Sequence, residues 1–365
     1  MKILTLFFTY GTSLENWYNN GSIDRELSVY KKFLKYFDKI YFITYGRKDL
    51  IFTNNFPKNI IVLPKKININ NSLYSILIPF LYKKEIKEST WLKTNQMMGS
   101  WSAVLSKIFF GKKLNIRTGY TESLSYLNKN FLKKNITKIV EFLSYKLSDV
   151  SIVTSQHQKD YIKEKYSPRN INIIPNGIDT EVFKPEKNKV SSDKTELLFI
   201  GRLHSEKNIL NLLEAIKYLK NIKFKIIGQG PLKKDILKFK EKYNLNLEML
   251  SSIPNNKLPA IYNAANIYIQ PSLYEGNPKT IIEAMSCGLP VIATDINGIN
   301  NVITHEKTGF LCKIASESIK SAILELVGDR ELRESLGKNA REFIEKKYDL
   351  NKLIASEIKI YESHH

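Results

Sequence analysis

Two hydrophobic patterns alternate along the chain. Short apolar runs, typical of buried strands, are separated by segments in which apolar residues recur every three or four positions, as in amphipathic helices. One such helix is predicted over Ile23–Phe37. This alternation predicts the α/β class, with parallel sheets covered by helices. In the first half the predicted strands are Ile3–Phe8, Lys39–Thr44, Ile60–Leu63, Trp91–Lys93, Leu114–Ile116, Val150–Thr154 and Ile171–Ile174.

The second half repeats the pattern. A helix with Ile209, Leu212 and Ile216 on one stripe follows its first strand. Between the halves lies Pro175–Thr195, and the polar stretch Lys187–Thr195 at its end is typical of an exposed linker. We therefore expect two Rossmann-like, doubly wound domains, 1–180 and 181–349, facing across a cleft, with ligands at the carboxyl ends of the strands. A last helix within 350–363 is compatible with either domain. The predicted strands are Leu197–Ile200, Phe224–Ile227, Leu247–Leu250, Ile267–Gln270 and Val291–Ala293.

Composition narrows the protein class. With 365 residues and 43% hydrophobic content, the chain is long enough for two ordinary globular domains. No apolar run reaches the roughly 18 residues that a membrane-spanning helix needs. The opening Met1–Tyr10 lacks a small-residue cleavage site and is predicted to be a first buried strand, which favours a cytoplasmic location. Cys287 and Cys312 lack metal-ligand spacing, so we expect two buried free thiols.

The net charge of +20 is unevenly distributed. Residues 1–180 contain 28 Lys and Arg against 13 Asp and Glu, whereas residues 181–365 contain 28 against 23. A basic first domain is suited to an anionic partner, such as a lipid-linked diphosphate or the inner face of a membrane. A lysine-rich surface without a specific partner is the alternative. The lysines follow no groove-reading motif, so nucleic acid is not an expected partner.

The segment Ile267–Ala293 is the most informative for chemistry. It is predicted to form a strand, a loop, a helix and a second buried strand. The loop brings Gly276 and Asn277 beyond the end of a strand, and Pro278, Lys279 and Thr280 begin the helix. Unpaired N–H groups and the positive end of the helix dipole at such a position favour phosphate or sugar oxygens.

Glu275 and Glu283 stand in this loop and helix. Two glutamates eight residues apart are ordinarily solvated surface acids. Here the residues after Glu283, Ala284 to Pro290, are small or apolar, which indicates a largely buried helix. Because a buried carboxylate without a partner is costly, the sequence favours a ligand-facing role for Glu283.

The run from Ser272 to Ala293, S-x-Y-E-G-x-P-x-x-x-x-E-A-M-x-x-G-x-P-V-I-A, resembles the E-x7-E signature of the family 4 retaining glycosyltransferases, which have the GT-B fold. The resemblance implies a nucleotide diphosphate sugar as donor, with Glu275 at the sugar and Glu283 at the ribose. It also implies that no cofactor or divalent metal is needed, and the chain has no Asp-x-Asp motif to hold one.

Two further motifs follow predicted strands. Gly201, Arg202 and Lys207 come after the first strand of the second half, and a guanidinium fork with an ammonium group suits a diphosphate. The resemblance implies that Arg202 and Lys207 grip the donor's diphosphate, whereas loop surface charge is the alternative. Gly228 and Gly230 resemble the family's G-x-G-P beside the nucleobase, where a tight strand-to-helix turn is the simpler interpretation.

The first half departs from the family's commonest pattern, and no histidine follows its middle strand. Relatives often have paired glycines before the first long helix, where backbone N–H groups meet the donor's phosphate. Here Gly21 alone directly precedes the helix, and the resemblance implies the same donor-binding role for it, with Ser22 as the expected N-cap. Trp17 is suited equally to an acceptor-side wall and to core packing. We expect acceptor-side positions for a set of polar residues at strand ends: Asn95, Arg117, Tyr120 and Glu122.

Together these observations predict a retaining glycosyltransferase that moves a sugar to a glycan, a lipid-linked molecule or another hydroxyl acceptor in cell-surface polysaccharide or glycoconjugate synthesis. Two alternatives stay open: a non-catalytic sugar-binding subunit of the same fold, and another GT-B enzyme such as a nucleotide-sugar epimerase. The nucleobase, the sugar and the acceptor are not encoded in any motif recognised here.

Overall fold

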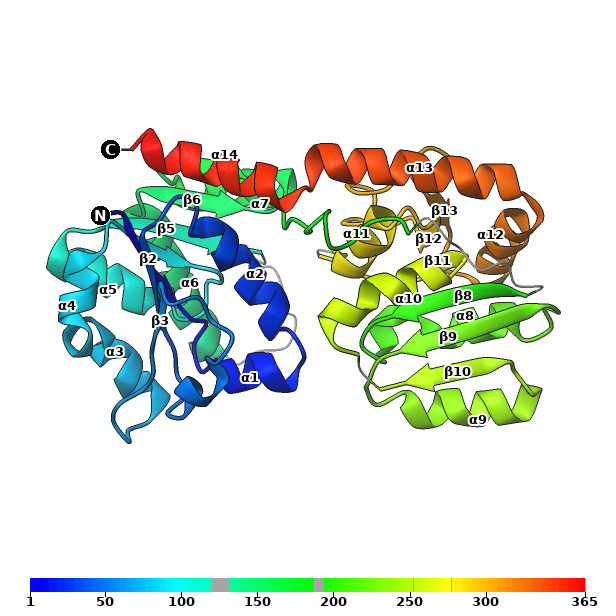
Figure 1. Ribbon diagram of the computed structural model, residues 1–365, viewed down its shortest axis with the longest axis horizontal. Helices are drawn as coiled ribbons and strands as arrows, with labels where there is room; N and C mark the ends of the chain where they lie inside the picture. The colour runs from blue at the N-terminus through cyan, green and yellow to red at the C-terminus, as the bar shows by residue number, and fades with distance from the viewer. Residues whose placement is uncertain (120–130, 187–193, 252, 277, 365) are drawn as a thin grey trace. The chain divides into compact units, whose positions relative to one another are not determined.

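The protein consists of two α/β units (Figure 1). The computed structural model describes residues 1–119, 131–186, 194–251, 253–276 and 278–364. One unit contains residues 1–176 and 351–365, and the other contains residues 177–350. The final helix therefore belongs with the first unit. The chain passes between the units twice, after Asn176 and after Leu350.

The first unit contains a parallel seven-stranded sheet in the order β3-β2-β1-β4-β5-β6-β7. Every strand predicted for this half is present, with ends shifted by at most two residues. The strands are β1 (Ile3–Phe7), β2 (Lys39–Ile43), β3 (Ile60–Leu63), β4 (Trp91–Thr94), β5 (Lys113–Thr118), β6 (Val150–Val153) and β7 (Ile171–Ile173).

Helices cover both faces of this sheet. Trp91 and Lys93 point towards the last helix, where the rings of Trp91 and Tyr361 stack with centroids 4.5 Å apart. The alternate residues Leu92 and Ile116 are buried on the opposite face. The predicted helix Ile23–Phe37 ends early, at Phe33, and continues as turns. The helices are α1 (Leu14–Asn19), α2 (Ile23–Phe33), α3 (Asn71–Leu81), α4 (Lys83–Glu88), α5 (Ser100–Phe110), α6 (Phe131–Leu147), α7 (Gln156–Tyr166) and α14 (Leu350–Glu362), with a 3-10 turn at Asp49–Phe52.

A buried ionic cluster fixes α14 to the first sheet. The Glu357 carboxylate accepts hydrogen bonds from Lys93 and Tyr361, from Asn115 at 3.1 Å and from Arg117 at 3.4 Å. Burial alone would raise the pKa of Glu357, but the positive charges of Lys93 and Arg117 together hold that pKa below its usual value. Burial lowers the pKa of Lys93 to about 8, although the Glu357 charge acts in the opposite direction.

The second unit contains a parallel six-stranded sheet in the order β10-β9-β8-β11-β12-β13. Five of these strands were predicted. The sixth, β13, was not predicted. The strands are β8 (Thr195–Ile200), β9 (Ile222–Ile227), β10 (Leu247–Leu250), β11 (Ile267–Gln270), β12 (Val291–Thr294) and β13 (Phe310–Cys312).

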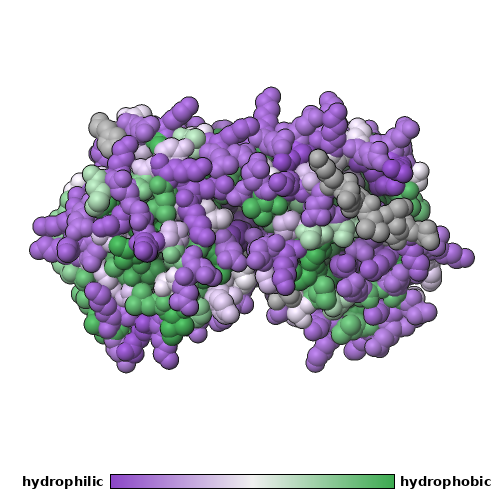
Figure 2. All heavy atoms as spheres, viewed as in Figure 1, coloured by the Kyte–Doolittle hydropathy of each residue, from purple (hydrophilic) through white to green (hydrophobic). Residues whose placement is uncertain are grey.

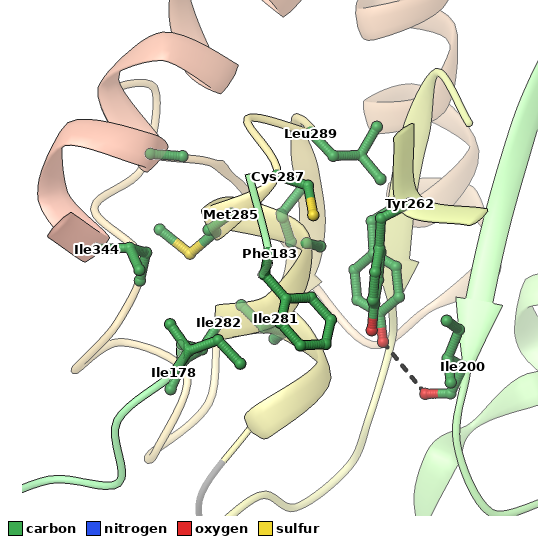
Figure 3. Packing of buried hydrophobic residues seen from close by; sticks show 14 of the residues in the cluster. Ile178, Phe183, Ile200, Tyr262, Ile281, Ile282, Met285, Cys287, Leu289 and Ile344 are labelled. Atoms are coloured by element: carbon green, nitrogen blue, oxygen red, sulfur yellow. Dashed lines mark hydrogen bonds between the residues drawn. The ribbon is translucent and has the colours of Figure 1, made fainter. Parts of the chain in front are cut away.

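The second sheet has a hydrophobic core on each face. Leu198 and Ile200 of β8 belong to one core, and Leu197 and Phe199 belong to the other. Figure 3 shows part of the first core around Tyr262. Cys287 and Cys312 are buried free thiols, as predicted. The helices are α8 (Ile209–Ile216), α9 (Lys233–Tyr243), α10 (Leu258–Ala264), α11 (Lys279–Ser286), α12 (Ser316–Gly328) and α13 (Arg330–Lys347), with 3-10 turns at Ser205–Lys207 and Asn255–Lys257.

The segment just before the predicted linker Lys187–Thr195 belongs to the second unit. Ile178 and Phe183 are buried in the core of the second unit. Ile178 also forms a parallel bridge with Asp349, so the two segments that leave this unit pair with each other. Residues 187–193 lie outside the described ranges.

Hydrophilic side chains cover most of the face shown in Figure 2, including the outer sides of α13 and α14. Within the described ranges, no helix combines the length and the hydrophobicity that crossing a bilayer requires.

Candidate active site

The candidate site lies at the carboxyl edge of the second sheet. Strand β8 has β9 on one side and β11 on the other, so the chain leaves β8 in one direction and returns on its other side. In parallel sheets such a switch point opens a crevice between two diverging loops. The loops after β8 and β11 are joined here, because the Leu273 N–H donates to the Glu206 carbonyl at 2.8 Å.

Lys207 and Glu275 form an ion pair between these two loops. The Glu275 oxygen that receives the Lys207 ammonium, Oε1, also accepts from the Gln270 amide and from the Ser272 hydroxyl at 2.8 Å. Glu275 is only 9% exposed. A buried carboxylate in contact with one cation and two neutral donors is held in a single orientation.

Gln270 connects Glu275 to the start of α11. Its side-chain oxygen accepts from the Tyr268 hydroxyl and from the Thr280 hydroxyl, each at 2.7 Å. The Tyr268 hydroxyl also donates to the Ile200 carbonyl at 3.2 Å, the dashed contact in Figure 3. The ends of β8 and β11 and the first turn of α11 are thus joined through the amide of one side chain.

Gly298 supports the same loop from the chain that follows β12. Its φ is +94°, and a Cβ added there would lie 2.0 Å from the Glu275 carbonyl oxygen. Only glycine permits this close approach of the two backbones.

Glu283 lies on the buried side of α11 and is 3% exposed. This carboxylate has a partner within the protein, because the Tyr262 hydroxyl donates to its Oε2 at 2.8 Å. Burial raises the pKa of Tyr262 well above its ordinary value, and the Glu283 charge raises it further. The phenol therefore remains a hydrogen-bond donor at any physiological pH.

The two cations of the β8 loop have different environments. The Lys207 side chain is 13% exposed, whereas that of Arg202 is 72% exposed and donates to Glu206 at 3.0 Å. The ion pair of Arg202 is of the surface kind, which is worth little in stability. Its guanidinium can thus move to a ligand at small energetic cost.

The glycines of this edge allow the loops after β8 and β9 to cross closely. A Cβ on Gly228 would lie 1.9 Å from the Gly201 carbonyl oxygen, and one on Gly230 would lie 2.4 Å from the Leu203 carbonyl oxygen. The Gly201 N–H donates to the Ile227 carbonyl at 3.0 Å. The structure therefore supplies a packing reason for Gly228 and Gly230, besides the approach of a nucleotide.

The loop before α11 is partly described. Gly276 is exposed, and Pro278 is buried at the N-cap, one residue before the first turn in which it was expected. Lys279 is exposed and Thr280 is half-buried. Asn277 lies outside the described residues.

Gly21 and Trp17 lie near the start of the first unit. Gly21 has φ +69° and joins α1 to α2. Ser22 occupies the N-cap of α2, but its side chain makes no capping bond and contacts Asn20 instead. The ring of Trp17 stacks on Phe8 with centroids 4.4 Å apart, so the core-packing alternative applies to this face of the indole.

Two of the polar residues expected on the acceptor side, Asn95 and Arg117, make hydrogen bonds within the first unit. Asn95 donates to the Tyr30 hydroxyl at 2.6 Å. Strand alternation directs the Arg117 side chain towards α14, and its acceptor-side role stays a prediction. One terminal nitrogen contacts Glu357, and the other donates to Ile174, Pro175 and Asn176 at 3.1–3.3 Å. Tyr120 and Glu122 lie outside the described residues.

Sequence reasoning missed Tyr262, Gln270, Ser272 and Gly298. A glutamine at the end of an otherwise apolar strand was a usable signal for Gln270, because buried amides require partners. Tyr262 and Gly298 carried no such signal, since their partners are distant in sequence. In the described part of the chain, no three His, Cys, Asp or Glu side chains are grouped as metal ligands would be.

Comparison with protein-family models shows the family to which this chain belongs. The family model "Glycosyl transferases group 1" matches residues 181–343, and "Glycosyltransferase Family 4" matches residues 38–182. The chain belongs to the family 4 glycosyltransferases. The first match contains both loops of the candidate site.

Two curated members are informative relatives. The UDP-Gal:α-D-GlcNAc-diphosphoundecaprenol α-1,3-galactosyltransferase of Escherichia coli is 33% identical over 241 residues, covering 60% of this chain and 62% of that protein. The phosphatidylinositol N-acetylglucosaminyltransferase gpi3 subunit of Schizosaccharomyces pombe is 31% identical over 180 residues, covering 47% of this chain and 40% of that protein. The chain thus spans less than two thirds of either relative's length.

Solved structures establish the fold of this chain. HepE of Anabaena, solved in complex with UDP, superposes with a TM-score of 0.80 at 16% identity, with all of both chains covered. Sucrose-phosphate synthase of Thermosynechococcus elongatus gives a TM-score of 0.78 at 19% identity, covering 100% of this chain and 99% of that one. The fold is GT-B, with two parallel-sheet Rossmann-like domains, as predicted.

Proposed function

We propose that this protein transfers a sugar from a nucleotide diphosphate sugar to a hydroxyl of a lipid-linked or glycan acceptor, with retention of the anomeric configuration. The observation that carries the proposal is the Lys207–Glu275 pair at the switch point of the second sheet, between the two loops that contain the family's motifs. This pair places a cation for phosphate beside a fixed carboxylate for sugar hydroxyls.

In this proposal the diphosphate of the donor lies against Lys207, Arg202 and the N-terminus of α11. As the bond between the sugar and the diphosphate breaks, negative charge develops on the leaving phosphate. Lys207 and Arg202 stabilise that charge, which lowers the barrier. These groups and the helix dipole neutralise the diphosphate without requiring a metal ion.

Glu275 acts on the sugar in the same proposal. Three donors already fix its Oε1, so the carboxylate is oriented before a sugar arrives and loses little freedom on binding. We assign it hydrogen bonds to sugar hydroxyls and not a covalent bond to the anomeric carbon. The acceptor oxygen then attacks from the face that the diphosphate leaves, and a phosphate oxygen accepts its proton.

Glu283 is proposed to bind the ribose, with Tyr262 as its positioning residue. The glycines Gly201, Gly228 and Gly230 leave the β8 and β9 loops without side chains that would obstruct a nucleobase. The names of two relatives and the UDP in HepE support a UDP sugar as donor and a lipid-linked acceptor, in synthesis of a cell-surface polysaccharide or glycoconjugate.

A thermal-shift experiment with UDP, GDP, ADP and CMP tests the donor site. A ligand at about 100 times its Kd stabilises a protein by about 2.7 kcal/mol, which is a visible shift in Tm. We expect one nucleoside diphosphate to raise Tm and CMP to have no effect. Lys207→Met should abolish most of the shift, whereas Lys238→Met, at an exposed lysine of α9, should preserve it.

The outcomes separate the alternatives. If no diphosphate raises Tm, the non-catalytic subunit is favoured and the proposal fails. Conversion of the nucleotide sugar to its epimer without any acceptor would identify the epimerase instead. Retention is tested by NMR of the anomeric proton in the product, and an inverted product would contradict the proposed same-face attack.

A further inference from the structure

The outer surface of three neighbouring helices in the first unit is strongly hydrophobic. Helices α3, α5 and α6 lie side by side, since α3 packs on α5 and α5 packs on α6. Each buries one side towards the sheet and leaves large apolar side chains exposed on the other. These side chains are Leu73, Ile76 and Phe80 on α3, Ile108 and Phe109 on α5, and Ile136, Ile139, Phe142 and Leu143 on α6. We call these nine residues the apolar face.

The residues of the apolar face follow helical spacing. On α3 they are three and four residues apart, and on α6 Ile136, Ile139 and Leu143 repeat that spacing. The rings of Phe80 and Phe109 lie 5.0 Å apart, which joins α3 to α5. A soluble helix ordinarily turns charged residues outward, so three adjacent helices with apolar outer sides indicate a surface that meets an apolar partner.

The charges of this layer are basic. Among the described side chains of α6, the exposed charged ones are Lys138 and Lys146, while Glu141 is buried and bound by the Tyr166 hydroxyl. Helix α3 has no charged residue, and the single one on α5, Lys107, pairs with Asp149. The adjoining α4 has exposed lysines at positions 83, 84 and 87 and one exposed glutamate, Glu88.

The exposed apolar side chains and the neighbouring lysines together indicate the chemistry of the partner. Exposed Ile, Leu and Phe on helices, flanked by lysines, are the features by which a surface enters the boundary of headgroups and acyl chains of an anionic bilayer. A second copy of this chain is a poorer match, because it would bring lysines against lysines. We propose that the apolar face, with Lys138 and Lys146, binds an anionic lipid membrane.

This inference rests on the proposed function in one respect, because a lipid-linked acceptor resides in such a membrane. Binding by this surface would hold the first unit at the membrane while the candidate donor site in the second unit stays unchanged. Membrane binding and donor binding can therefore be measured separately.

Vesicle co-sedimentation of the full chain tests the proposal. The probes are vesicles of phosphatidylcholine alone and of phosphatidylcholine mixed with phosphatidylglycerol. We expect binding to the mixed vesicles, weakened by salt. Lys138→Gln combined with Lys146→Gln should weaken partitioning by roughly 25-fold, or about fivefold for each lysine. Ile139→Ser and Phe142→Ser should each weaken it by roughly tenfold.

A matched control comes from the second unit. Leu324→Ser with Lys320→Gln removes an exposed apolar residue and an exposed lysine four residues apart on α12, as Phe142→Ser with Lys146→Gln does on α6. The control should bind mixed vesicles as the unmodified protein does. All variants should keep the thermal shift given by the nucleoside diphosphate, which shows that they are folded and that the donor site is intact.

Three results would overturn the inference: no binding to either vesicle, equal binding to both, or equal losses in the α6 and α12 variants. A dimer in solution that Ile139→Ser dissociates would instead assign the apolar face to a second copy. None of these results affects the nucleotide test, so failure of the membrane inference is distinguishable from failure of the proposed function.

Discussion

Glu275 is an acid whose position is determined by its neighbours. Lys207 comes from the loop after β8, whereas Gln270 and Ser272 come from the end of β11, and all three meet at one carboxylate oxygen. The ion pair with Lys207 alone would allow rotation, because an ammonium group is a point charge without directional preference. The amide of Gln270 adds direction, and it is in turn fixed by Tyr268 and Thr280.

Gln270→Met tests this role of the amide. The change preserves the volume but removes the acceptor of the Thr280 hydroxyl, one of two acceptors near the Tyr268 hydroxyl, and one of the three donors to Glu275. We expect the free energy of unfolding to fall by about 1–3 kcal/mol. If Gln270 positions Glu275 for the sugar, kcat should fall while the Kd for the nucleoside diphosphate changes little.

Gln156→Met provides the comparison for that experiment. Gln156 is exposed on α7 and bonds only Asp160 at 2.7 Å among the contacts described for it. Its replacement should leave unfolding and kcat nearly unchanged. Equal effects of the two substitutions, or a loss of nucleotide affinity that parallels the loss of kcat, would contradict a positioning role for Gln270.

At the scale of secondary-structure elements, contacts between loops fix the positions of the site residues. The loop that contains Glu275 is contacted by the Gln270 side chain and by the backbone at Gly298. The loop that bears Lys207 is attached to it through Glu206 and Leu273. These contacts fix two loops that follow different strands, so the sheet order positions the ion pair.

Gly298→Ala should displace the Glu275 loop. The new Cβ would meet the Glu275 carbonyl oxygen, and the positive φ adds roughly 1–2 kcal/mol of strain. Gly111→Ala is the control, since Gly111 has φ +67° with nothing within 4 Å of an added Cβ. We expect Gly111→Ala to lower stability modestly and to preserve transfer, and Gly298→Ala to lower both. Activity retained in Gly298→Ala would show that the loop tolerates the shift.

At the scale of the whole molecule, two segments connect the units, one after Asn176 and one after Leu350. Arg117 of the first unit contacts both of them, Glu357 on α14 and the backbone at Ile174 and Pro175. In the second unit the same connections meet at the bridge between Ile178 and Asp349. Each unit therefore has its own contacts to both of the segments that connect the units.

Glu357→Gln should destabilise the first unit by about 3–5 kcal/mol at neutral pH, because it leaves Lys93 buried without its partner charge. The pKa of Glu357 is held below its usual value, so its stabilisation is present above about pH 4.3, the ordinary glutamate pKa, and is lost as pH falls through the depressed value. The unmodified protein should thus lose stability on acidification more steeply than Glu357→Gln.

Urea unfolding followed by tryptophan fluorescence measures this difference. All three tryptophans, Trp17, Trp91 and Trp101, lie in the first unit, so the signal reports on it. Glu362→Gln is the control, because Glu362 is exposed on the same helix, 3.7 Å from Lys2. Parallel pH profiles for the unmodified protein and Glu357→Gln would contradict a stabilising role of the buried pair.

Much of the fold was predictable because the determining patterns are local. The apolar runs of β1 and β12 and the helical stripe of α8 are complete within a few residues, and buried parallel strands are hydrophobic throughout. The same holds for the motif from Ser272 to Ala293, in which order and spacing are visible without a structure. The short β13 and the true end of α2 depend on neighbours that no local pattern reveals.

By itself the sequence determined the alternation of strands and helices, the motif residues and the excess of positive charge in the first half, since each is a property of residue type and spacing. Only the tertiary structure decided which polar and charged groups meet: Lys207 with Glu275, Tyr262 with Glu283, and Arg117 with Glu357. The physical reason is that pairing of buried groups follows from strand order and face, which bring together residues as distant as Arg117 and Glu357.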